Sequence, residues 1–234
     1  MNLGLEGKLI VVAGGAGDIG QATCKILSQE GAIIEVADKV DDVNLAYMDD
    51  VRPFFQNLRA KYDTIHGFVS LVYGGRAEGV ADTSVARFEE VLRNTLHAAV
   101  YSAQESLRWM LEKGQGGHFV FVSSINSVLG LNEFAYDVAK AGLNQVARDI
   151  ASAHGKDGIY AVTLCPGTVA PTRAWEGREE SLEKIASVIP DGRVTTPEEV
   201  AHAIAFLLSE PAQMFSGHTL LADRGWSLRP LFTK

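Results

Sequence analysis

Apolar runs rich in β-branched residues alternate with segments of helical period along almost the whole chain. The apolar runs predict buried strands, and the segments with a period of about 3.6 residues predict helices that bury one face. The expected strands are Lys8–Ala13, Ala32–Asp38, Ile65–Tyr73, His118–Ser124, Tyr160–Gly167 and His218–Asp223, with a further short one ending at Asp50. The expected helices are Asp18–Gly31, Phe54–Tyr62, Val85–Glu112, Tyr136–His154 and Thr196–Ser209.

This alternation predicts the fold class. Seven strands alternating with helices imply a parallel, doubly wound, seven-stranded sheet in a three-layer α/β/α arrangement. Sequence repeats, low-complexity tracts and linkers are absent, so residues 1–234 are expected to form one domain. Ligands of such sheets bind beyond the carboxyl ends of the strands. We therefore expect one site where five loops meet, namely those following Ala13, Asp38, Tyr73, Ser124 and Gly167.

The composition narrows the class of protein and of partner. Of the 234 residues, 47% are hydrophobic and 21% are charged, which is enough apolar material for a sizeable core. The net charge of -8 argues against nucleic acid as a partner, because phosphate backbones need a basic face. The first residues lack the pattern of a signal peptide, and no apolar run approaches the roughly 18 residues of a membrane span. A soluble cytoplasmic protein without membrane contact is expected, and no residues are assigned to a metal.

The stretch AGGAGDIG, Ala13–Gly20, follows the first strand and opens the first helix. Its glycines fit three registers of a dinucleotide-binding turn: Gly15-x-Gly17-x-x-Gly20, Gly14-x-x-Gly17-x-x-Gly20, and Gly14-x-x-x-Asp18-x-Gly20 with one glycine replaced. In each register, a tight turn without side chains aims the free N–H groups of a helix at an anion. We expect the backbone around Gly17–Ile19 to touch a cofactor, while the Asp18 carboxylate caps the helix or points aside.

Asp38 strengthens this interpretation. It ends the second strand, 18 residues after Gly20, where an acid accepts hydrogen bonds from an adenosine ribose and repels a 2′-phosphate. NAD is therefore the expected cofactor, although the adjacent Lys39 leaves some tolerance of NADP open. Asp50, with its neighbour Val51, is a further candidate contact to the adenine amino group, and a helix cap is the equal alternative for Asp50.

Tyr136 and Lys140, in YDVAK, lie four residues apart and so share one face of a helix. An ammonium group near a phenol favours the phenolate, and the pKa of a tyrosine must fall from about 10 by roughly 2–3 for proton transfer near neutrality. Ser124 ends the preceding strand, and its hydroxyl would donate to a substrate oxygen beside the phenol. Ser123 is the neighbouring candidate, because strand alternation points only one of the two hydroxyls into the site.

In their order and spacing, these features resemble the short-chain dehydrogenase/reductase family. The resemblance covers nearly the whole chain and includes CPG after the sixth strand and PEEVAHAIAFLLS…G…LLAD near the end. It implies an NAD(P)-dependent oxidoreductase of Rossmann fold, with Tyr136 as the acid/base, Lys140 on the nicotinamide ribose and Ser124 on the substrate oxygen. It further implies a homotetramer or a homodimer, and cofactor contacts along the nicotinamide from Pro166, Gly167, Val169 and Thr172.

The chain departs from the family's pattern at four places, the first of which is Ala13, where the family usually has a threonine before the first glycine. The usual Asn-Asn-Ala-Gly after the fourth strand is LVYG, Leu71–Gly74. The asparagine that commonly completes the proton relay is replaced on the long helix by Thr95, or by Asn94 after a one-residue shift. The usual Asp-Gly-Gly near the end contains Arg224. The serine, tyrosine and lysine are intact, so these departures concern the proton path.

The segment 173–193, between the Pro-Gly turn and the last helix, is the expected substrate lid. Trp175 would pack on an apolar substrate or anchor the lid. Arg173 would pair with a substrate carboxylate or, as is commoner for arginine, lie free on the surface, and Tyr73 and Arg76 are further pocket candidates. The expected function is NAD-dependent hydride transfer to or from a small secondary alcohol or ketone. Two alternatives stay open: an NADP-dependent carbonyl reductase, and a dinucleotide-binding sensor or scaffold with little catalysis.

Overall fold

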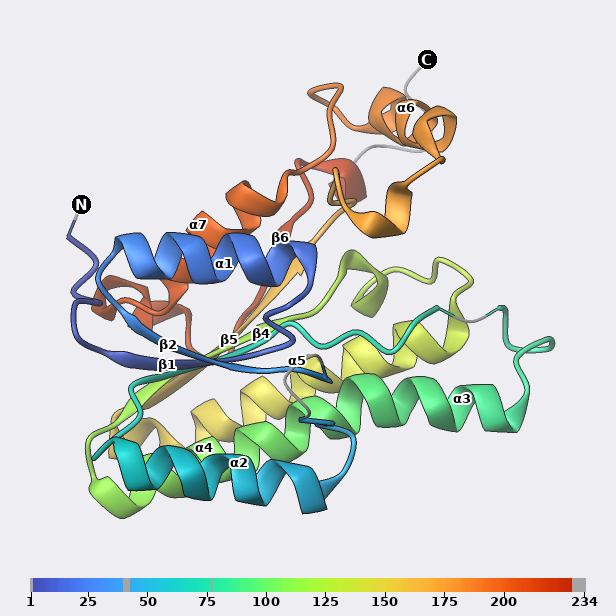
Figure 1. The fold of residues 1–234 in the computed structure, drawn as a ribbon. Coiled ribbons are helices and arrows are strands. Elements are labelled where there is room, and N and C mark those ends of the chain that lie inside the picture. Colours follow the sequence, from blue (N-terminus) through green and yellow to red (C-terminus); the bar gives the residue numbers. More distant parts are fainter. Residues whose placement is uncertain (1, 40–42, 77, 229–234) are drawn as a thin grey trace.

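The computed structural model describes residues 2–39, 43–76 and 78–228. Within them, six parallel strands form one sheet, in the order β2-β1-β3-β4-β5-β6. The strands are β1 (Leu9–Ala13), β2 (Ile33–Ala37), β3 (Gly67–Ser70), β4 (Gly117–Val122), β5 (Ile159–Pro166) and β6 (Thr219–Ala222). Helices cover both faces of the sheet, which confirms the predicted three-layer, doubly wound α/β fold (Figure 1).

Two hydrophobic cores hold the helices to the sheet. The side chains of Ile10 and Val12 in β1 face one layer, and those of Leu9 and Val11 face the other, because successive strand residues point to opposite faces. The first layer contains α1 (Asp18–Gln29) and α7 (Pro197–Leu207), and the second contains α2 (Met48–Lys61), α4 (Ala98–Lys113) and α5 (Phe134–His154). The remaining helices are α3 (Val85–Leu92), which leads into α4, and α6 (Glu179–Val188), which lies apart from both layers (Figure 1).

The short strand expected to end at Asp50 is absent from the described sheet, which therefore has six strands and not seven. The segment is helical instead: α2 begins at Met48 and runs through Pro53. Two acids, Asp49 and Asp50, occupy its first turn, where negative charge interacts favourably with the helix dipole. The expected helix start at Phe54 treated the proline as a boundary, but the helix tolerates it near its amino end.

The long helix predicted over Val85–Glu112 forms with a local change of winding. A π-helical turn, Arg93–His97, joins α3 to α4, and Thr95 lies within it with no exposed surface. Such turns insert an extra residue into the helix and occur often at functional sites. None of the helices in the described residues combines the length and the apolarity that crossing a bilayer requires.

The register of the strands places the candidate site at one edge of the sheet. Ala13, the last residue of β1, lies opposite Ala37 in β2 and opposite Ser70 in β3. The chain adds β2 on one side of β1 and then returns to add β3 on the other, and such a switch point is where open parallel sheets bind ligands. The residues that follow these strands therefore begin the site.

Candidate functional site

The glycine-rich turn after β1 requires glycine at two positions. Gly14 has a φ of +82°, and a Cβ there would lie 2.9 Å from the carbonyl carbon of Leu71. A Cβ at Gly20 would lie 2.5 Å from the carbonyl oxygen of Gly14, so α1 packs directly on the turn. The Asp38 carboxylate closes the turn from β2 by accepting the N–H of Ala16 at 3.0 Å. This packing presents the amino end of α1, whose first N–H groups have no partners within the helix.

A cavity of about 120 Å³ opens beside this turn. Polar groups from three strand ends and from the π-helical turn meet at it, and Lys39 Nζ donates to Asn94 Oδ1 at 3.2 Å. Its lining comprises Gly14, Ala37, Asp38, Lys39, Val43, Asn44, Leu45, Ala46, Val72, Tyr73, Asn94 and Ala98. The apolar side chains of the lining suit the flat ring of an adenine base. One Asp38 carboxylate oxygen is bound by the Ala16 N–H, and the other can accept hydrogen bonds from ribose hydroxyls. The residues present therefore fit the adenosine half of a dinucleotide.

Asp50 and Val51, the other adenosine candidates, are not among the described residues that line this cavity. Val51, on the buried face of α2, is fully buried in the core, and the Asp50 carboxylate accepts the N–H of Asn44 at 3.3 Å. Both residues lie in the first turns of the helix, which begins before them at Met48, so their contact with adenine stays a prediction. The segment instead contributes Asn44, Leu45 and Ala46, which carry no sequence signal of their own.

The Asp18 carboxylate has a partner within the protein. It accepts the backbone N–H of Arg173 at 2.8 Å and the Nε–H of the same residue at 3.2 Å. The Arg173 guanidinium also donates to the carbonyl oxygen of Ala16 at 3.0 Å. Arg173, a candidate for a substrate carboxylate or a free surface charge, is thus bound to the glycine-rich turn through the Asp18 carboxylate.

The two serines that follow β4 have different surroundings. Ser123 Oγ donates to the backbone oxygen of Lys140 at 2.8 Å and so faces α5. Ser124 Oγ donates to Asn126 Oδ1 at 3.0 Å, accepts the Asn126 N–H at 3.2 Å, and hydrogen-bonds with the Tyr136 phenol. Of the two hydroxyls left open by strand alternation, the one beside the phenol is that of Ser124.

Tyr136 and Lys140 lie one turn apart on α5 and are both nearly buried, at 9% and 4% exposed. Lys140 Nζ is 5.7 Å from the centre of the Tyr136 ring and donates to the backbone oxygens of Val122 at 2.9 Å and Val72 at 3.3 Å. Val72 belongs to LVYG, so its carbonyl binds the ammonium where the family's asparagine is missing.

Burial dominates the ionisation of both groups. It raises the pKa of Tyr136 to about 12, although the Ser124 hydrogen bond and the charge of Arg76 work in the opposite direction. It lowers the pKa of Lys140 to about 8. Without a bound cofactor, the Tyr136 phenol is therefore protonated near neutrality. The Lys140 ammonium by itself does not lower the pKa of Tyr136 to the value that proton transfer requires. Additional positive charge at the site is needed.

The two candidates for the missing relay residue are both engaged elsewhere. Thr95 Oγ1 accepts the N–H of Gly74 at 2.9 Å, which ties the π-helical turn to the loop after β3. Asn94 accepts from Lys39 at the cavity and donates its amide to the backbone oxygen of Glu90 at 3.0 Å. In the described part of the chain, neither side chain hydrogen-bonds to Lys140 or Tyr136.

The loop after β5 leads from the sheet to the lid. Pro166 ends β5, and a Cβ at Gly167 would lie 3.2 Å from Cα of Asp223, so the turn packs closely on the end of β6. Val169 then forms a parallel bridge with Thr195. Thr172 precedes the short helical turn Arg173–Trp175. This path brings the lid back over the glycine-rich turn.

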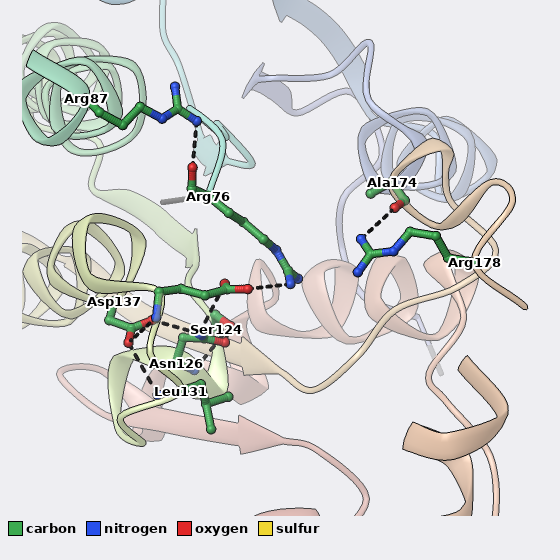
Figure 2. Close-up of polar contacts among 9 residues, drawn as sticks. Arg76, Arg87, Ser124, Asn126, Leu131, Asp137, Ala174 and Arg178 are labelled. Carbon is green, nitrogen blue, oxygen red and sulfur yellow. Dashed lines mark hydrogen bonds and ion pairs between the residues drawn. The ribbon is translucent and has the colours of Figure 1, made fainter. Parts of the chain in front are cut away.

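Aromatic and charged residues surround the phenol on its lid side. The rings of Tyr73 and Tyr136 pack edge to face with centres 5.8 Å apart. Arg76, after β3, pairs with Glu133 at 2.6 Å, just before α5 (Figure 2). Trp175 is 8% exposed and lies against the guanidinium groups of Arg76 and Arg178.

Three residues around the phenol and the lid are not predicted from the sequence, namely Asn126, Glu133 and Arg178. Asn126 sits in the polar run SSINS directly after a strand, which is a usable signal. The sequence around Glu133 and Arg178 gives no such signal, because Arg76, the residue that brings them together, comes from a distant part of the chain.

Comparisons with known proteins show which chains this one resembles. A family model described as enoyl-(acyl carrier protein) reductase matches residues 14–227. The chain is 31% identical to the cis-4-hydroxycyclohexanecarboxylate dehydrogenase of Sinomonas cyclohexanicum, over 94% of this chain and 96% of that protein. It is 29% identical to the acetoacetyl-CoA reductase of Synechocystis sp., over 96% and 98% of the two chains. A solved oxidoreductase of the short chain dehydrogenase/reductase family from Burkholderia thailandensis superposes with a TM-score of 0.85 at 27% identity, covering 95% of this chain and 94% of that one.

Proposed function

The chain belongs to the short-chain dehydrogenase/reductase family, and from this premise we propose that it is an NAD-dependent oxidoreductase acting on a secondary alcohol or ketone. The observation that carries the proposal is the meeting of Ser124, Tyr136 and Lys140 at the carboxyl end of β4, beside the glycine-rich turn. A hydroxyl donor, a phenol and an ammonium group are the groups that polarise a carbonyl and move a proton to it.

In this proposal, the bound nicotinamide dinucleotide supplies or accepts the hydride. The turn at Gly14–Gly20 and the amino end of α1 hold its diphosphate, with contacts from Gly17, Asp18 and Ile19, and Asp38 holds the adenosine ribose. Pro166, Gly167, Val169 and Thr172 lie on the strand end and loop that lead to the lid, and we assign to them the nicotinamide half.

The protein's own residues perform the remaining steps. Ser124 holds the substrate oxygen by a hydrogen bond beside the phenol. Tyr136 receives the hydroxyl proton when an alcohol is oxidised and returns it when a ketone is reduced. Lys140 binds the nicotinamide ribose, and its ammonium favours the phenolate. Thr95 keeps the loop after β3 in place next to Lys140.

The preference for NAD over NADP rests on Asp38, whose carboxylate would repel a 2′-phosphate. We further propose a cytoplasmic, single-domain protein that assembles as a homotetramer, or a homodimer, through α4 and α5. Light scattering of the purified chain checks the assembly.

The test is a panel of ketones and secondary alcohols with NADH and NAD, followed by the absorbance of the reduced nicotinamide. Tyr136→Phe is expected to abolish turnover and to leave NADH binding intact, because the ring stays and only the proton donor is lost. Full turnover by this variant would contradict the assignment. Tight NADH binding without turnover of any compound would favour a dinucleotide sensor.

A further inference from the structure

Two arginines from different parts of the chain meet at one tryptophan of the lid. The guanidinium carbon of Arg178 lies 4.6 Å from the centre of the Trp175 ring, and that of Arg76 lies 5.8 Å from it. Figure 2 shows the Arg76 and Arg178 side chains reaching toward each other, one from the loop after β3 and the other from the lid. We call this group the arginine pair.

Arg76 connects the arginine pair to the reacting groups. The positive charge of Arg76 acts on the Tyr136 phenol and lowers its pKa against the effect of burial. Glu133, one residue before α5, pairs with Arg76 at 2.6 Å and accepts from the Asn126 amide at 3.5 Å, and Asn126 in turn accepts from Ser124 Oγ at 3.0 Å. Burial raises the pKa of Glu133, and the charges of Arg76 and Arg178 act in the opposite direction. A substrate held at Ser124 and Tyr136 would therefore extend toward these guanidinium groups.

Among the residues that the structure describes, one positive charge of the pair has no carboxylate partner. Glu133 pairs with Arg76, and Asp137 is engaged by the Asn126 amide at 2.7 Å and by two backbone N–H groups. Within the described residues, the Arg178 guanidinium has only a long contact of 3.5 Å to the Ala174 oxygen besides its stacking on Trp175. Its remaining N–H groups are free to bind an anion.

Contacts within the protein position both arginines: Glu133 pairs with the Arg76 guanidinium, and Trp175 stacks on that of Arg178. The backbone oxygen of Arg76 accepts from Arg87 Nη2 at 2.6 Å, which ties the loop after β3 to α3 (Figure 2). Stacking on the indole holds Arg178 in one plane. A planar, prepositioned guanidinium matches a carboxylate in two parallel hydrogen bonds, which an ammonium group does not.

We propose that the arginine pair binds a carboxylate at the end of the substrate remote from its hydroxyl or keto group, so that the substrate class is a hydroxy acid or its keto acid. Arg178 makes the main contact, and Arg76 adds charge while staying paired with Glu133. The identification of the reaction rests on the proposed function, whereas the anion site itself does not.

Turnover tests the substrate class. Hydroxybutyrate and the hydroxycyclohexanecarboxylate isomers are each compared with their methyl esters, which keep the carbon skeleton and remove the charge. The wild type is expected to prefer the best acid over its ester by about 10- to 100-fold in kcat/KM, the usual range for one charge-assisted hydrogen-bonded pair. Arg178→Gln should lower kcat/KM for the acid and leave that for the ester unchanged, so that their ratio approaches one. Arg178→Lys should restore part of the preference for the acid.

Arg193→Gln is the matched control. It removes the same charge from the far end of the lid, where Arg193 is paired with Glu199 at 2.9 Å, and should leave the ratio unchanged. Two results would overturn the proposal. In one, the wild type turns over esters as well as acids, and in the other, Arg178→Gln loses activity toward acids and esters equally.

Binding separates this inference from the proposed function. Cyclohexanecarboxylate, which has no hydroxyl to oxidise, and the neutral cyclohexanecarboxamide are titrated calorimetrically into the protein saturated with NAD. A preference of the wild type for the carboxylate that Arg178→Gln loses would support the anion site even if no alcohol were turned over. Equal binding of both probes together with turnover of neutral alcohols would refute the anion site and leave the proposed function standing.

Discussion

Arg173 of the lid donates both its backbone N–H and its Nε–H to the carboxylate of Asp18, at 2.8 and 3.2 Å, across the glycine-rich turn. An acid at this position looks unsuitable, because a helix amino end should attract a phosphate and not repel it. The contact with Arg173 removes this repulsion, because the guanidinium neutralises the Asp18 carboxylate and holds it toward the lid. The turn keeps its anion-binding N–H groups, and the lid gains an anchor.

The first prediction concerns this pair. Arg173→Ala leaves the Asp18 charge uncompensated beside the diphosphate, and NADH affinity should fall by about 1 kcal/mol, or roughly fivefold. Asp18→Asn in the same chain should recover most of the loss, because the repulsion is gone. The side chains are 63% and 30% exposed, so neither change should lower the melting temperature appreciably. Fluorescence titration of NADH measures the affinity, and a double variant as weak as Arg173→Ala would mean that Arg173 itself binds the diphosphate.

The second prediction separates two roles of Asp38. One carboxylate oxygen accepts the N–H of Ala16 at 3.0 Å, and the other is available to a ribose. Asp38→Asn keeps an acceptor for the turn and removes the charge, so it should weaken NAD binding and improve NADP binding, moving the preference by about tenfold or more toward NADP. Asp38→Ala should weaken both cofactors, because the turn loses its partner. Affinities of both dinucleotides for both variants check this, and an unchanged preference in Asp38→Asn would remove the carboxylate from cofactor selection.

The third prediction is a pH dependence. Because burial holds the pKa of Tyr136 at about 12, the phenolate needed for alcohol oxidation becomes more abundant as pH rises, and kcat/KM for oxidation should rise from neutral to alkaline pH. Lys140→Gln removes the ammonium and should shift this rise to higher pH. Since the pKa of Lys140 is about 8, the difference between variant and wild type should narrow above that pH, where the wild type loses the same charge.

Lys39→Gln, on the adenosine side, is the control for this pH profile. It should change cofactor binding and leave the pH dependence of oxidation in place. Profiles of wild type and Lys140→Gln that run parallel at every pH would limit Lys140 to cofactor binding.

The fourth prediction concerns Thr95, the buried residue of the π-helical turn, whose hydroxyl accepts the N–H of Gly74 in the loop after β3. Thr95→Val keeps the shape and leaves that N–H without a partner, which should lower the free energy of unfolding by about 1–3 kcal/mol. Thr95→Ser should preserve most of the stability. Urea unfolding measures both, and a stable Thr95→Val variant that loses turnover would point to a direct part in the proton path.

The overall architecture was predictable because each strand and helix has its own local pattern. Buried strands such as Leu9–Ala13 are continuous apolar runs, and the carboxyl ends of parallel strands must share one edge, so Gly14, Asp38 and Ser124 were placed together correctly at that edge. The misassigned strand at Asp50 failed because a proline was taken as a helix boundary, whereas α2 begins before it.

The contacts between distant segments were not predictable from local patterns. Arg178 and Arg76 lie far apart along the chain, and only the fold of the lid brings both to Trp175. The same holds for Arg173, for which a free charge was expected because its partner Asp18 belongs to another motif. Charged residues on a lid therefore acquire a role only when their neighbours are known.

The last prediction concerns Glu199, which joins the lid's end to α7. It accepts the N–H of Thr196 at 2.9 Å in the capping box and pairs with Arg193 and Arg224. The hydrogen bonds from Arg193 and Arg224 hold the pKa of this carboxyl at about 2, below its ordinary 4.5. Because the pKa is lower in the folded state, its contribution to the free energy of unfolding is complete above about pH 4.5 and disappears as pH falls through about 2.

Glu199→Gln should therefore lower the free energy of unfolding by about 1 kcal/mol near neutrality, a modest amount because the side chain is 37% exposed and solvent screens it. The difference from the wild type should vanish toward about pH 2, where the wild-type carboxyl is itself protonated. Arg224→Gly is the matched variant, since the φ of +58° suits glycine and only the side chain is lost. It should remove part of the same pH-dependent stability in urea unfolding across a pH series. A difference between Glu199→Gln and wild type that stays constant at every pH would show that capping geometry, and not charge, makes this residue stabilising.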